Sequence, residues 1–214
     1  MKINLFSETI GTSFLLLIVV GSGIMGENLT ENKAVVLLAN SIATAFGLIV
    51  LIWIFGPYSG AHFNPAVSIL MMLLGKLTKQ DMLFYIFCQI IGGVAGVVLA
   101  NIIFDLDIIS ISDNRRLTTG IFISEIIATF GLLLTILLVS KQKPEMVAAA
   151  VGLYIGAAYW FTSSTSFSNP AVTIARTLSD TFTGIVPSDV VPFIFAQLIG
   201  TFIVYFIYKY VYEQ

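Results

Sequence analysis

Long apolar runs separated by short polar segments are the dominant pattern of this chain. Runs long enough to cross a hydrocarbon core of ~30 Å occur at about residues 5–25, 34–56, 82–104, 120–140, 145–163 and 190–211. Helix-capping residues agree with these limits, because Thr78 with Asp81 can form a capping box and Thr119 can cap the fourth run. The pattern predicts an all-α membrane protein with six transmembrane helices.

Two further apolar segments, at residues 64–74 and 169 to about 178, are too short to span a membrane. At a rise of ~1.5 Å per residue, each covers about half of the hydrocarbon core. Each begins with Asn-Pro, where Asn can cap a helix and Pro fits its first turn. The sequence therefore predicts two re-entrant half-helices, both in the protein interior because irregular backbone is not tolerated against lipid.

An internal repeat relates the two parts of the chain. The paired segments are "SETIGTSFLLL" from Ser7 with "SEIIATFGLLL" from Ser124, "FNPAVS" from Phe63 with "SNPAVT" from Ser168, and "FCQIIGG" from Phe87 with "FAQLIGT" from Phe195. Because each half has three spans, the second half must be inverted relative to the first. We expect one membrane domain, 1–214, with halves 1–104 and 119–214 whose Asn-Pro-Ala turns meet at the midplane.

The basic residues of the short loops predict the orientation. One side holds Lys2, Lys76, Lys79, Lys141, Lys143 and Lys209, and the other holds Lys33, Arg115 and Arg116. The positive-inside tendency places both termini in the cytoplasm. We expect a multi-pass protein of the cell's inner (plasma) membrane.

Composition narrows the class of function. The chain is 57% hydrophobic and 10% charged, with a formal net charge of −2, so no basic surface for nucleic acid is indicated. The single cysteine, Cys88, is interpreted as a packing residue. The sequence has no metal-ligand cluster, activated nucleophile or phosphate-binding loop. We therefore expect neither an enzyme nor a cofactor.

The midplane turns indicate a pore. Two half-helix N-termini direct positive dipole ends and amide donors into one passage, which favours neutral hydrogen-bonding solutes and repels cations. The predicted midplane residues are Asn64, Pro65, Ala66, Asn169, Pro170 and Ala171.

The paired "HFNPAVS" and "FSNPAVT", the "SE" that opens each half and the six spans resemble the major intrinsic protein family of aquaporins and aquaglyceroporins. The resemblance covers essentially the whole chain. It implies the aquaporin-like fold, a homotetramer with one pore in each subunit, and small neutral solutes and the lipid bilayer as partners.

The same resemblance implies a selectivity constriction. Its four residues here are Thr44, Ala157, Ser166 and Val172. Val172 stands where the family typically has arginine, so we expect a wide, weakly polar constriction. The placement of Thr44 and Ala157 assumes an alignment without gaps, and a slip by one helical turn is the alternative.

Arg176 lies one turn beyond Val172 and can reach the outer vestibule. Alternatively, it pairs with Asp180 or with an outer-loop carboxylate, which would be Asp105, Asp107 or Asp113. The run "NPAVTIARTLSDTF" resembles a bacterial subgroup of aquaglyceroporins associated with arsenic resistance.

Three polar residues near the re-entrant loops complete the candidate site. By resemblance, Glu8 and Glu125 accept hydrogen bonds from these loops and hold them, although intramembrane carboxylates can instead relay protons. His62 is expected on the cytoplasmic side of the pore, either as a pH gate or as ordinary loop packing.

These features predict a passive channel for small uncharged solutes and water. Glycerol-like polyols and undissociated metalloid acids such as arsenous acid are the expected solutes. The alternatives are a strict water channel, a proton-coupled secondary transporter, which can also contain inverted repeats, and a membrane structural protein without permeability.

Overall fold

The computed structural model describes residues 2–212, and within them every regular element is a helix. The longer elements are α1 (Lys2–Leu29), α2 (Lys33–Ser59), α3 (Pro65–Leu73), α4 (Lys79–Ile103), α5 (Thr119–Gln142), α6 (Val147–Phe161), α7 (Pro170–Ala175) and α8 (Val190–Ile207). Short 3-10 turns cover Pro144–Met146, Arg176–Leu178 and Pro187–Asp189, and a π turn covers Tyr208–Tyr212. The all-α prediction is confirmed.

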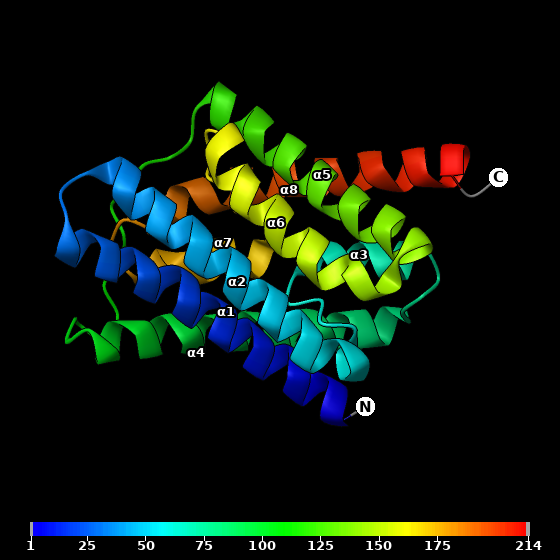
Figure 1. The fold of residues 1–214 in the computed structure, drawn as a ribbon, viewed down its shortest axis with the longest axis horizontal. Helices are drawn as coiled ribbons and strands as arrows, with labels where there is room; N and C mark the ends of the chain where they lie inside the picture. The colour runs from blue at the N-terminus through cyan, green and yellow to red at the C-terminus, as the bar shows by residue number, and fades with distance from the viewer. Residues whose placement is uncertain (1, 213–214) are drawn as a thin grey trace.

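The six predicted spans correspond to α1, α2, α4, α5, α6 and α8 (Figure 1). By length and hydropathy, five of these segments can cross a membrane, and α6 with its 15 residues is the exception. A 15-residue helix rises about 22 Å, and the preceding 3-10 turn adds about 6 Å. Together they approach the ~30 Å of the hydrocarbon core.

Both half-helices start where the Asn-Pro pairs predict. The side chain of Asn64 accepts a hydrogen bond from Ala66 N at 2.9 Å, and that of Asn169 accepts one from Ala171 N at 3.0 Å. The second half-helix leaves α geometry after Ala175 and continues as a 3-10 turn to Leu178. Its α-helical part is therefore shorter than predicted.

Of the two caps predicted for the long helices, one is at the predicted residue and the other is one residue earlier in the chain. Thr78 accepts from Asp81 N at 3.0 Å and donates to the Asp81 carboxylate at 2.7 Å. The cap of α5 is Thr118, which accepts from Ile121 N at 3.1 Å, whereas the predicted Thr119 is the first helical residue. Adjacent threonines offer the same hydroxyl, so the sequence pattern does not distinguish them.

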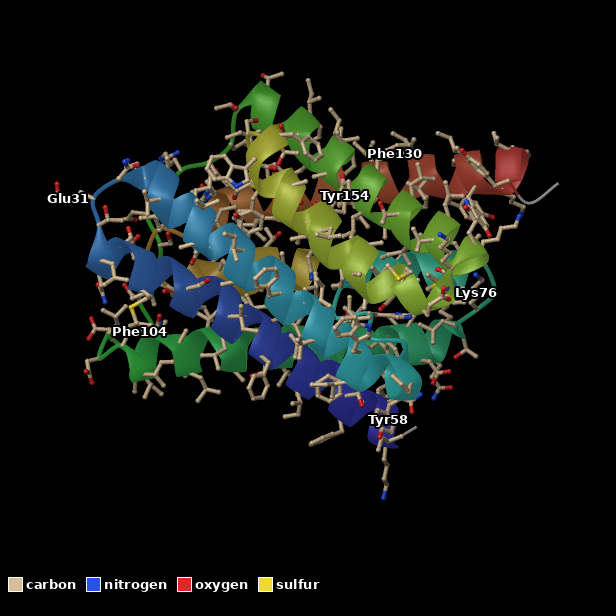
Figure 2. The ribbon with its side chains drawn as sticks, viewed as in Figure 1. Glu31, Tyr58, Lys76, Phe104, Phe130 and Tyr154 are labelled. Carbon is tan, nitrogen blue, oxygen red and sulfur yellow. The ribbon has the colours of Figure 1, made fainter. Side chains whose placement is uncertain are left out.

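Both chain ends lie at one end of the bundle, together with the connections α3–α4 and α5–α6 (Figure 1). The connections α1–α2 and α4–α5 lie at the opposite end. Lys76 and Glu31 mark these two ends in Figure 2. This arrangement fits an even number of membrane crossings.

Small residues bring α4 directly onto α1. A Cβ added at Gly92 would collide with the Thr9 carbonyl, and one added at Gly96 would collide with the Ser13 carbonyl. Such close approach is typical of helices that pack in membranes. Large apolar side chains face outward instead, for example Phe6, Trp53, Phe87, Leu153 and Phe195. The lipid-facing surface and the close-packed interior identify a multi-pass membrane protein.

Candidate functional site

The two halves of the chain are joined by reciprocal hydrogen bonds between the re-entrant loops. Asn64 Nδ2 donates to the Ser168 carbonyl at 2.7 Å, and Asn169 Nδ2 donates to the Phe63 carbonyl at 2.8 Å. Both asparagines are at least 95% buried. The two Asn-Pro-Ala turns therefore meet, as the inverted repeat predicts.

Both loops hold their backbone in the left-handed region. The φ angles are 48° at Ala61 and Phe63 in the first loop, and 52° at Ser166 and 48° at Ser168 in the second. Residues with a side chain rarely adopt this conformation, and it persists where the surrounding structure enforces it. The strained loops therefore require firm support from their neighbours.

The Glu8 carboxylate supplies that support in the first half. Oε1 accepts from Ser59 Oγ at 2.6 Å and from His62 N at 2.9 Å. Oε2 accepts from Phe63 N at 2.8 Å and from Gln89 Nε2 at 2.7 Å. The carboxylate is fully buried and engages four donors.

Glu125 makes the corresponding contacts in the second half. Its oxygens accept from Phe167 N and Ser168 N, both at 2.9 Å, and from Gln197 Nε2 at 2.7 Å. Gln89 and Gln197 are not among the predicted site residues. Both occupy the same place in the repeated "FCQIIGG" and "FAQLIGT" segments, and this repetition of a polar residue is the signal that identifies them.

A cavity of about 310 Å³ runs through the meeting point of the two loops. Asn64, Asn169, Val67 and Val172 line its middle. Towards the end that holds the termini it is lined by Met71, Lys76 and Ser140, and towards the other end by Thr44, Tyr159 and Arg176. No aspartate or glutamate is among the described residues that line it.

Three of the four residues predicted for the constriction line the cavity. Thr44, Ser166 and Val172 line the cavity, as predicted. Ala157 is exposed on the outer face of α6, so its predicted placement in the pore is wrong. Tyr159, two residues later, faces the cavity instead, and its hydroxyl lies 3.2 Å from Thr44 Oγ1.

Arg176 also lines the cavity. Its side chain is 3% exposed, and its guanidinium carbon lies 3.6 Å from the centre of the Phe167 ring. Its Nε donates to the Thr183 carbonyl. Asp180 instead accepts hydrogen bonds from Ser112 Oγ and Asp113 N. Because Arg176 and Tyr159 both line the cavity, its wall at this end is more polar than the four residues predicted for the constriction would make it.

His62 lines the cavity at the first re-entrant loop. Its Nδ1 lies 3.0 Å from Ser68 Oγ, and its ring packs edge-on against Tyr85 with centroids 5.2 Å apart. Both contacts are those of a packed loop residue.

Comparison with known proteins agrees with this geometry. The family described as "Major intrinsic protein" matches residues 2–166. The chain is 49% identical over 194 residues to Aquaglyceroporin AqpS of Rhizobium meliloti (strain 1021), covering 91% of this chain and 83% of that protein. It is 30% identical over 162 residues to Aquaporin NIP1-2 of Arabidopsis thaliana, covering 72% of this chain and 54% of that protein.

The fold also matches a solved structure. The aquaglyceroporin from Plasmodium falciparum superposes with a TM-score of 0.75 at 24% identity, covering 98% of this chain and 96% of that one. The paired Asn-Pro-Ala turns, the cavity between them and these matches together show that this chain belongs to the major intrinsic protein family.

Proposed function

We propose that this protein is a passive channel for water and small uncharged polyhydroxy solutes such as glycerol. The observation that carries the proposal is the cavity that both Asn64 and Asn169 line. Among the residues that the structure describes, no aspartate or glutamate lines it. The name of the relative AqpS supports the same class of solute. Undissociated metalloid acids such as arsenous acid, which present hydroxyl groups of similar size, are proposed as further solutes.

The charge distribution along the cavity favours neutral solutes. The N-termini of α3 and α7 bring positive dipole ends to its middle, and the Arg176 guanidinium lies at its outer part. A cation would meet this positive potential without a carboxylate to replace its hydration shell, so its barrier is high. A neutral molecule loses only hydrogen bonds that the pore can replace.

The constriction suits a solute with one polar and one apolar side. The guanidinium of Arg176 and the hydroxyls of Tyr159 and Thr44 offer hydrogen bonds, while Phe167 and Val172 offer apolar surface. A polyol has hydroxyl groups along one edge and C–H groups along the other. Water uses the same donors and acceptors, and we propose it as a co-permeant.

The structure gives less support to a proton-coupled transporter than to a passive channel. Glu8 and Glu125 are absent from the cavity lining and engage donors of the loops and of Gln89 and Gln197. These contacts are those of residues that hold the loops. We propose that both glutamates scaffold the pore rather than carry protons.

We further propose a homotetramer in the inner membrane with both termini in the cytoplasm. The family resemblance supports the assembly, and the basic residues at the end that holds the termini support the orientation.

The proposal is tested by stopped-flow measurements of water, glycerol and arsenite permeability in proteoliposomes. We expect all three to exceed the values of empty liposomes. Water permeability alone would indicate a strict water channel, and no permeability at all would refute a channel function.

A further inference from the structure

Arg116 lies outside the cavity lining but binds the segment that carries the anchor of Arg176. Its Nε donates to the Gly184 carbonyl at 2.6 Å, and its Nη2 donates to the Phe182 carbonyl at 2.7 Å. The backbone N–H of Arg116 donates to the Asp189 carboxylate at 2.7 Å. Arg116 therefore links the α4–α5 loop to the segment 182–184.

The residue between these two carbonyls is Thr183, whose own carbonyl accepts from Arg176 Nε. Three consecutive carbonyls are thus shared by two arginines, with the pore arginine on the middle one. Phe182 N also donates to Glu27 at 2.9 Å, which fixes the start of the segment. A shift of the segment would move the anchor of Arg176.

The two guanidinium groups also act on each other through their charge. Both lie against the Phe167 ring, with Arg116 at 5.3 Å and Arg176 at 3.6 Å from its centre. They are therefore no more than about 9 Å apart, a distance at which partly buried charges interact appreciably. Burial lowers the pKa of Arg116 to about 10, so it remains charged at neutral pH.

We propose that Arg116 is a positioning residue for solute selection: it holds the segment 182–184 so that Arg176 stays in the constriction, and its positive charge repels the Arg176 guanidinium and so helps to fix its place. This inference rests on the proposed channel function. It assigns a role in selectivity to a residue that the solute does not touch.

The test compares Arg116→Gln with Arg115→Gln in proteoliposomes. Arg115 is the adjacent, exposed residue, so its substitution removes the same charge from the same loop and leaves the segment 182–184 bound. We expect Arg116→Gln to raise the glycerol-to-water permeability ratio by about two- to five-fold, a typical size for coupling between contacting residues. Arg115→Gln should match the wild type.

A double-mutant cycle separates positioning from general damage to the loop. If Arg116 acts through Arg176, then Arg116→Gln has no further effect on the ratio in an Arg176→Gln background. Equal effects in both backgrounds would overturn the proposal. Arg116→Lys is the second variant, because lysine keeps the charge but not the forked grip on two carbonyls. It should raise the ratio less than glutamine does.

A wild-type protein that conducts, combined with Gln and Lys variants at position 116 that both match it, would refute the role of Arg116 and leave the channel intact. A wild-type protein that conducts neither water nor glycerol would refute the proposed function itself.

Discussion

The side-chain amide of Asn64 donates to the carbonyl of Ser168 at 2.7 Å, across the boundary between the two halves of the chain. Asn169 returns the bond to the Phe63 carbonyl, and each Asn Oδ1 caps its own half-helix. Each asparagine thus performs two structural tasks with its two polar atoms. Both residues also line the cavity.

Substitution of the asparagines should separate these tasks. Asn64→Asp retains the capping oxygen and loses the donor, whereas Asn64→Leu loses both. We expect a lower melting temperature for Asp and a further loss for Leu, since each unpaired buried group costs ~1–3 kcal/mol. Thermal unfolding in detergent measures the order, and stopped-flow light scattering measures the flux. A folded double variant, Asn64→Leu with Asn169→Leu, that conducts like the wild type would exclude a pore built on both motifs.

Removal of the loop-holding carboxylates should affect stability before selectivity. Glu125→Ala leaves Phe167 N and Ser168 N without their acceptor, at ~1–3 kcal/mol for each N–H. Glu125→Gln keeps one acceptor and should be milder, and Glu8 should behave in the same way. Melting temperature and the glycerol-to-water ratio are measured together. A fully stable Glu125→Gln protein that has lost a pH-dependent transport activity would instead indicate a proton relay.

The width of the constriction should respond to Val172 and Arg176 in opposite directions. Val172→Arg adds a long side chain and a further cation near Arg176, which raises the barrier for glycerol more than for water. We expect the glycerol-to-water ratio to fall by about ten-fold, the effect of ~1.4 kcal/mol on a barrier. Arg176→Ala should raise it. Unchanged ratios in both variants, at matched protein density, would place the constriction elsewhere.

Tyr159 and Ala157 provide a matched pair on one helix. Tyr159→Ala removes a ring and a hydroxyl from the cavity wall, so the glycerol-to-water ratio should rise about two- to five-fold. Ala157→Leu enlarges a side chain that faces away from the pore and should leave the ratio unchanged. The same proteoliposome assay measures both, and the opposite pattern would restore Ala157 to the pore.

The sequence predicts the parts of the site that depend on local chemistry. Asn-Pro predicts a helix start at which Asn is the N-cap and Pro lies in the first turn. The structure confirms this start at Asn64 and Asn169. The repeat relates Glu8 to Glu125, and both carboxylates accept hydrogen bonds from the loops.

The parts that depend on the rotation of a helix or the path of a loop are predicted less well. The prediction of Ala157 as a pore residue uses its distance in sequence from the second Asn-Pro-Ala motif, whereas the helical spacing of its neighbours places it on another face of α6. Val147, Val151, Ile155 and Tyr159 follow each other at four-residue intervals on one face, and all four line the cavity. The direction of Arg176 depends on the Thr183 carbonyl, which lies seven residues further along the chain. No local sequence pattern predicts a hydrogen bond of this kind between a side chain and a distant carbonyl.

The most direct test of the passive pore is the dependence of glycerol flux on concentration and on a pH gradient. In proteoliposomes with the wild-type protein, we predict a flux above that of empty liposomes that rises linearly with the glycerol gradient and stays the same when a pH gradient is imposed. A flux that saturates and follows the pH gradient would contradict the channel and identify a proton-coupled transporter.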